Sequence, residues 1–110
     1  MTYQANSQPE PTREEVDQME GAVLLEFGAA WCGHCQTLQP ELAEALAKQP
    51  EVRHVKIEDG KGKPLGRSFR VKLWPTLVFM LNGQVLKQVS RPSFQELGEG
   101  MELLRKRCHL

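Results

Sequence analysis

The chain has 110 residues, 40% of them apolar, and its 14 basic and 14 acidic side chains give a formal net charge of zero. This length and composition suit one globular domain, and the balanced charge argues against binding to nucleic acid or to an anionic membrane. Three cysteines are too few for a disulfide-stapled secreted scaffold. No apolar run approaches the ~20 residues of a membrane helix, and residues 1–19 show no secretory signal, so we expect a cytoplasmic protein.

The N-terminal region predicts a polar arm and a short helix. Residues 1–11, with several prolines and polar side chains, are expected to form a flexible arm, and residues 12–110 a single domain. Thr12 begins the helix, because Glu15 lies three residues later and can complete a capping box. Gly21 is the predicted end of this element.

A buried strand and a long helix come next. Residues 22–27 are apolar on both faces except at Glu26, which is typical of an inner strand with helices packed on either side. Residues 35–48 predict an amphipathic helix, within which Pro40 should introduce a kink. The core-facing positions of this helix recur at helical spacing and are Leu38, Leu42, Ala45 and Leu46.

The middle of the chain predicts a second strand and a short helix. In residues 52–57 the side chains alternate, so His54 and Lys56 should share the face opposite to Val55. His54 is expected to be an ordinary surface residue. Residues 64–69 follow a glycine-rich polar loop and are expected to form a short helix.

The C-terminal region predicts a hairpin and a last helix. Residues 76–81 form an apolar strand, Asn82-Gly83 favours a tight turn, and residues 85–89 return as a more polar strand at the sheet edge. Ser93 and Glu96 form a second capping box. The last helix presents an apolar stripe made of Phe94, Leu97, Met101 and Leu104. This order of elements predicts an α/β fold, a three-layer α/β/α sandwich with a central mixed sheet.

Two cysteines three residues apart lie between the first predicted strand and the long helix, in Trp31-Cys32-Gly33-His34-Cys35. This placement indicates thiol–disulfide chemistry. At a helix start, the free amides and the helix dipole favour a Cys32 thiolate, and Cys35 one turn later can close a disulfide with it. Gly33 is expected to let the backbone turn tightly. His34, when protonated, should stabilise the Cys32 thiolate and make the disulfide more oxidising.

These residues predict a two-step exchange reaction. Cys32 attacks a substrate disulfide, and Cys35 then attacks Cys32 and releases the reduced product. The second step requires Cys35 to lose a proton, and Glu26, the ionisable residue of the buried strand, is the candidate acceptor. Lys56, if it lies on the neighbouring strand and the same face, is expected to tune Glu26 or share its proton.

Taken together, these features resemble the thioredoxin family from about residue 22 to the last helix. The family pattern has a buried acid six residues before the first cysteine of W-C-x-x-C, a proline in the following helix, a cis-proline before an apolar strand, and an Asn-Gly hairpin. In this chain the pattern is matched by Glu26, residues 31–35, Pro40, Pro75 and Asn82-Gly83. The resemblance implies a thioredoxin fold whose first strand is short or missing, since residues 1–11 hold no clear strand.

The resemblance also implies a substrate surface. Pro75 should follow Trp74 in a cis peptide and lie against the cysteine pair. The Trp74 backbone would bind an extended substrate by strand addition. The implied substrate-contacting residues are Trp31, Gly33, Trp74, Pro75 and Thr76. The implied partners are protein disulfide substrates and a reductase or other dithiol recycling partner; the protein would work as a monomer, without cofactor, metal, nucleic acid or membrane.

The chain departs from the family pattern at four places. His34 stands where typical thioredoxins have proline, as in protein disulfide isomerases, and should make the centre less reducing. Glu26 replaces an aspartate. Gly28 replaces an aromatic residue and would leave one wall of the site open. Ser90-Arg91 replaces a glycine pattern after the last strand and would alter the substrate groove.

Two alternatives stay open at this level. A C-x-x-C pair can be half of a zinc site, with Cys108 and His109 as the other ligands, although the spacing matches no common zinc pattern and Cys108 fits the end of an apolar helix face better. The protein could also be a thioredoxin-fold binding module or chaperone-like adaptor with incidental redox activity. The favoured prediction is a protein-disulfide oxidoreductase.

Overall fold

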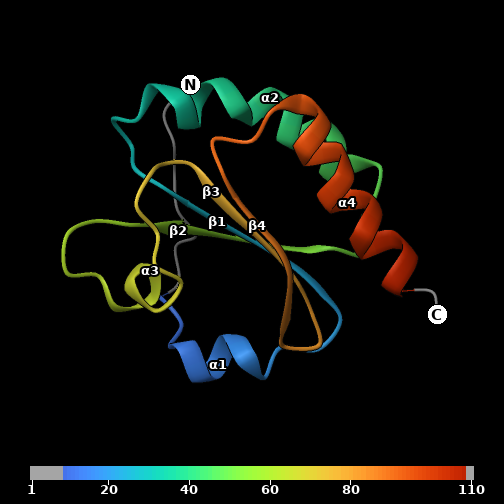
Figure 1. The fold of residues 1–110 in the computed structure, drawn as a ribbon, viewed down its shortest axis with the longest axis horizontal. Helices are drawn as coiled ribbons and strands as arrows, with labels where there is room; N and C mark the ends of the chain where they lie inside the picture. Colours follow the sequence, from blue (N-terminus) through green and yellow to red (C-terminus); the bar gives the residue numbers. More distant parts are fainter. Residues whose placement is uncertain (1–8, 109–110) are drawn as a thin grey trace.

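The computed structural model describes residues 9–108, which form a four-stranded mixed sheet with helices on both faces (Figure 1). The strand order is β2-β1-β3-β4; β1 runs parallel to β2, and β3 runs antiparallel to both β1 and β4. The helices α2 and α4 lie together on one face, and α1 and α3 on the other. The elements are α1 Arg13–Asp17, β1 Ala22–Gly28, α2 Gly33–Ala47, β2 Arg53–Glu58, α3 Pro64–Ser68, β3 Thr76–Leu81, β4 Gln84–Ser90 and α4 Phe94–Cys108.

The central strand β1 divides the core into two layers, because all seven of its residues are buried. Its odd-numbered positions pack with α1, α3 and the inner faces of β2 and β3, in a cluster that includes Phe27 and Phe69. Its even-numbered positions Ala22 and Leu24 pack beneath α2 and α4. Glu26 continues this second row, so the one charged residue of β1 lies on the face covered by α2.

The capping boxes and the tight turn that the sequence predicted are present in the structure. Thr12 and Glu15 make the reciprocal bonds of a capping box, and Ser93 and Glu96 repeat them at the start of α4. Asn82-Gly83 turns β3 into β4 with φ angles of 49° and 81°, the left-handed pair that a tight hairpin requires. The hairpin places β4 at the sheet edge.

Several boundaries and one core residue differ from the prediction. Helix α1 ends at Asp17, before Gly21. Strand β2 is displaced by one residue, and β4 is longer by one residue at each end. Pro40 lies inside α2 without ending it. Phe94 is 74% exposed and does not join the core stripe. As the first residue of α4 it has no preceding turn to lie on, because helical side chains lean toward the N-terminus.

The predicted arm and the family's first strand fall mostly on residues 1–8, which lie outside the described residues. In the part of the chain that the structure describes, no helix is long and apolar enough to cross a membrane.

Candidate active site

The two cysteines occupy the start of α2. Cys32 is the N-cap of the helix, and its Sγ accepts a hydrogen bond from the Cys35 amide at 3.2 Å. Both thiols are free; Cys32 retains 6% exposure and Cys35 has none. The Sγ atom of Cys32 therefore caps the first turn of the helix and lies at the rim of the site. This arrangement makes Cys32 the thiol that an incoming disulfide can reach.

Cys35 is held as a thiol. Its pKa is raised from an ordinary value of 9.0 to about 12, mainly by burial and next by a hydrogen bond with the Cys32 side chain. The charges of Cys32 and Glu26 act in the same direction, and only a backbone bond at Ala29 opposes them. At neutral pH the Cys35 thiol therefore keeps its proton unless a nearby group takes it.

Glu26 lies beneath this cysteine and is fully buried. Its Oε2 accepts a hydrogen bond from Nε2 of Gln39 at 2.6 Å, and the same Nε2 donates to the carbonyl of Cys35 at 2.9 Å. Gln39 therefore joins the carboxylate of Glu26 to the backbone of Cys35. The sequence analysis missed Gln39, although it lies four residues after Cys35 and so shares its helix face.

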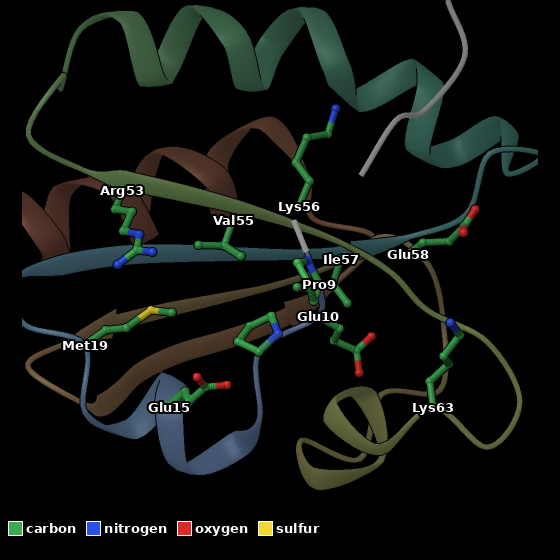
Figure 2. A pocket seen from close by; sticks show the side chains of 11 residues that line it. Pro9, Glu10, Glu15, Met19, Arg53, Val55, Lys56, Ile57, Glu58 and Lys63 are labelled. Carbon is green, nitrogen blue, oxygen red and sulfur yellow. The ribbon is translucent and has the colours of Figure 1, made fainter. Parts of the chain in front are cut away.

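Lys56 lies on the strand next to Glu26 and on the same face, which is the placement that its expected role requires (Figure 2). It pairs with Glu26 in the parallel register of β1 and β2, and its Nζ donates to Oε1 of Gln39 at 2.9 Å. In Figure 2 its side chain rises toward α2, whereas Ile57 points to the other face of the sheet. One amide side chain thus contacts both the carboxylate and the ammonium group.

His54 is not an ordinary surface residue, so that prediction was wrong. Its Nε2 lies 2.7 Å from Oε1 of Glu26, and its side chain is 24% exposed. The signal that could have found it was its alternation with Lys56, which puts both on the face of Glu26. Each carboxylate oxygen of Glu26 therefore has a polar partner from a different element.

The loop before β3 forms another wall of the site, next to the two cysteines. The Trp74-Pro75 peptide is cis, as predicted, and Trp74 packs against Cys32 and Cys35. The Trp74 indole donates to Oδ2 of Asp59 at 2.9 Å and meets the Trp31 ring edge-on at 5.2 Å between centroids. Trp31 is 77% exposed. The two indoles therefore form an apolar wall beside the reactive sulfur.

Three expectations about this surface need correction. Thr76 is fully buried, and its hydroxyl donates to the Leu73 carbonyl at 2.6 Å, so its side chain is not available to a substrate. Gly33 has no positive φ and has open space where a Cβ would lie, so no tight turn requires it. Gly28 is buried and does not line the groove.

A shallow groove runs past the Cys32 sulfur. Besides the motif residues Trp31 to His34, its walls are formed by Lys72, Leu73, Trp74 and Arg91. The carbonyl of Trp74, which the resemblance assigns to substrate binding, accepts a hydrogen bond from Nε of Arg91 at 3.0 Å. A separate hollow beside β2 and α1 includes none of the motif residues (Figure 2).

Among the side chains that the structure describes, those of residues 9–107, no cluster of three metal-ligating groups occurs. The zinc alternative also needs His109, which lies outside the described residues.

The model of the family described as thioredoxin matches residues 5–102. The chain belongs to the thioredoxin family. The structure of thioredoxin 2 from Pseudomonas aeruginosa PAO1 in its reduced form is 49% identical, with a TM-score of 0.79 over 97% of both chains. The structure of mitochondrial thioredoxin 3 from Saccharomyces cerevisiae is 26% identical, with a TM-score of 0.74 over 82% of this chain and 85% of that one.

This thioredoxin-family protein is also similar to longer proteins. A thioredoxin H-type from Ricinus communis is 31% identical over 71% of this chain and 66% of its own length. A protein disulfide-isomerase from Gallus gallus is 34% identical over 77% of this chain, but over only 17% of its own length. Family membership and these likenesses identify the protein in general terms as a thiol–disulfide oxidoreductase.

Proposed function

We propose that this protein reduces or exchanges disulfide bonds of other proteins through the Cys32–Cys35 dithiol. The observation that carries the proposal is the unequal setting of the two sulfurs. Cys32 caps a helix at the rim of a groove, whereas Cys35 is fully buried with a pKa of about 12. Cys32 is placed to attack a substrate disulfide, and Cys35 reacts only after the mixed disulfide has formed.

The first step forms that mixed disulfide. The Cys32 thiolate attacks one sulfur of the substrate disulfide, the substrate S–S bond breaks, and the second substrate sulfur leaves as a thiolate that takes a proton. In the second step Cys35 loses its proton and attacks Sγ of Cys32. The Cys32–Cys35 bond forms, the remaining substrate sulfur leaves, and two electrons have passed to the substrate.

Glu26 is the proposed proton acceptor in the second step. Its contact with Gln39, which also donates to the Cys35 carbonyl, supports this role, as does the effect of its charge on the Cys35 thiol. Gln39 and Lys56 position the carboxylate. His34 is exposed next to Cys32 and, when protonated, favours the thiolate and so an oxidising potential.

The direction of electron flow depends on a recycling partner. We propose that a reductase or another dithiol returns the Cys32–Cys35 disulfide to the reduced state, which would give net reduction of client proteins. A cytoplasmic location and action as a monomer are part of this proposal. The groove beside Cys32, with its exposed Trp31, supports a protein segment as the substrate.

An insulin-reduction assay with dithiothreitol tests the proposal. The protein should accelerate precipitation of the insulin B chain, and Cys32→Ser should abolish the acceleration. Cys35→Ser should accumulate mixed disulfides with client proteins, which non-reducing gels separate and mass spectrometry identifies. Equal rates for the protein and Cys32→Ser would refute the enzymatic function and leave the binding-module alternative.

A further inference from the structure

We propose that Arg91, together with Lys72, makes the groove beside Cys32 selective for protein segments that carry an acidic residue next to their disulfide. This inference rests on the proposed function and names the class of substrate that the site prefers. It depends on three observations: the anchoring of Arg91, its contact with the Trp74 carbonyl, and the charge of the groove.

Arg91 is fixed by its backbone at the end of β4. Its amide donates to the carbonyl of Pro75 at 2.7 Å, and its φ of 50° lies in the left-handed region that arginine rarely adopts. A residue with a side chain in this conformation persists only where surrounding contacts hold it. The anchored backbone places the start of the Arg91 side chain beside the cis-proline loop.

The guanidinium of Arg91 occupies an acceptor that a substrate would use. Nε donates to the carbonyl of Trp74 at 3.0 Å, at the edge where an extended segment would add as a strand. A substrate amide must share this carbonyl or displace Arg91 from it. In either case the backbone of Arg91 stays bonded to Pro75, so its side chain still begins at the wall of the groove.

The groove is basic although the whole chain is neutral. Three of its eight lining residues are His34, Lys72 and Arg91, and none of the eight is acidic. Among residues 9–108, no carboxylate forms an ion pair with Lys72 or Arg91. Both side chains are exposed, so their charges are available to a bound segment.

A substrate segment with an acidic residue would bind this groove more tightly than a segment with a neutral residue at the same position. Arginine can hold a carboxylate with two parallel hydrogen bonds, and rim charges of this kind speed association and make it dependent on salt. One exposed ion pair supplies a preference of up to about fivefold. The exposed rings of Trp31 and the exposed Leu73 provide apolar contact that does not depend on the charge of the substrate.

Two synthetic peptides with the same disulfide, flanked by glutamate in one and by lysine in the other, test the inference. We expect kcat/KM for reduction to be up to about fivefold higher for the glutamate peptide at low salt. The preference should shrink toward unity when the ionic strength is raised to about 1 M, where charges are screened within about 3 Å. This salt dependence uses the unaltered protein and does not depend on the folding of a variant.

Arg91→Ala should lower the ratio of the two kcat/KM values, and Arg91→Glu should invert it. Arg67→Ala, which removes an exposed charge on α3 outside the groove, should leave the ratio unchanged. Equal kcat/KM values for both peptides, or a ratio that Arg91→Glu does not alter, would overturn the inference while the oxidoreductase function stands. Failure to reduce either peptide would instead contradict the proposed function itself.

Discussion

Nε2 of His54 lies 2.7 Å from Oε1 of Glu26, which joins a fully buried carboxylate to a side chain that is 24% exposed. The contact links β1 to β2 on the face that α2 covers. A buried carboxylate oxygen needs a hydrogen-bond partner, because an unsatisfied one lowers the free energy of unfolding. If Glu26 takes the Cys35 proton as proposed, the same contact connects that carboxylate to a partly exposed side chain through which the proton can leave.

Two substitutions at His54 separate these two effects. His54→Leu should lower the free energy of unfolding by about 1–3 kcal/mol, because the buried carboxylate loses its hydrogen bond with His54. His54→Gln can still donate to Glu26 and should retain most of the stability, but it cannot exchange a proton as imidazole does. Urea denaturation measures the first effect, and the decay rate of a mixed disulfide measures the second. Arg53→Ala, one residue away and exposed, is the control; equal stability of the leucine variant and this control would contradict the first expectation.

Replacing Glu26 with glutamine should slow the release of substrate from Cys32. The amide keeps a similar shape but takes no proton from Cys35, whose pKa of about 12 leaves it protonated at neutral pH. General-base contributions of this kind are about 10²-fold or more, so we expect the second step to slow by at least tenfold, while formation of the mixed disulfide is little changed. Rapid-quench analysis resolves the two steps. Identical rates for the second step would remove Glu26 from its assigned role.

The two thiols should differ sharply in their reaction with iodoacetamide. Between about pH 7 and pH 9, Cys32 should be alkylated in the folded reduced protein, while Cys35 stays unmodified because burial raises its pKa to about 12. Peptide mass spectrometry after a short exposure gives the modification of each residue. Rapid labelling of Cys35 in the folded protein would contradict its assignment as the protected thiol.

The raised pKa of Cys35 also predicts how stability changes in alkali. The folded protein keeps the Cys35 proton while the unfolded chain loses it above about pH 9, so the unfolded state binds fewer protons there. The free energy of unfolding of the reduced protein should therefore fall as pH rises from 9 toward 12. Cys35→Ala, compared by urea denaturation at both ends of this range, should show a smaller fall. A fall of the same size in the variant would mean that other groups cause it.

Two glycines of α4 should respond oppositely to alanine. A Cβ at Gly100 would collide with the Phe79 ring of β3, whereas a Cβ at Gly98 meets nothing within 4 Å. Gly100→Ala should thus lower the free energy of unfolding by about 1–3 kcal/mol through overpacking. Gly98→Ala should raise it by about 0.5–1 kcal/mol, because alanine favours the helix. Thermal or urea denaturation of both variants tests the close approach of α4 to the sheet; changes of the same sign would contradict it.

Features that depend on neighbouring residues were predictable from the sequence. Each capping box joins residues three apart, and the Asn82-Gly83 turn needs only two residues that tolerate positive φ. The cysteine pair and the acid before it follow from motif spacing, and the resemblance to thioredoxins added the cis peptide at Pro75. Such features form through local geometry, so a pattern of residue types is enough to indicate them.

The environment of Glu26 was decided by the tertiary structure. The sequence placed an acid in a buried strand and His54 beside Lys56, but it did not reveal which side chains of β2 would oppose the acid. The register of β1 with β2 pairs Glu26 with Lys56 and Leu24 with His54, which makes His54 the diagonal neighbour of the carboxylate. A shift of one residue would have turned both basic side chains to the opposite face.

The same division applies to the substrate groove. The sequence identified Cys32, Trp31 and Trp74 as residues of the reactive surface, because each lies in or beside a recognised motif. It did not show that Arg91, 17 residues after Trp74, donates to the carbonyl of that residue. That contact forms because the β3–β4 hairpin returns the chain to the cis-proline loop, and the distance between chain segments is set by the sheet and not by sequence separation.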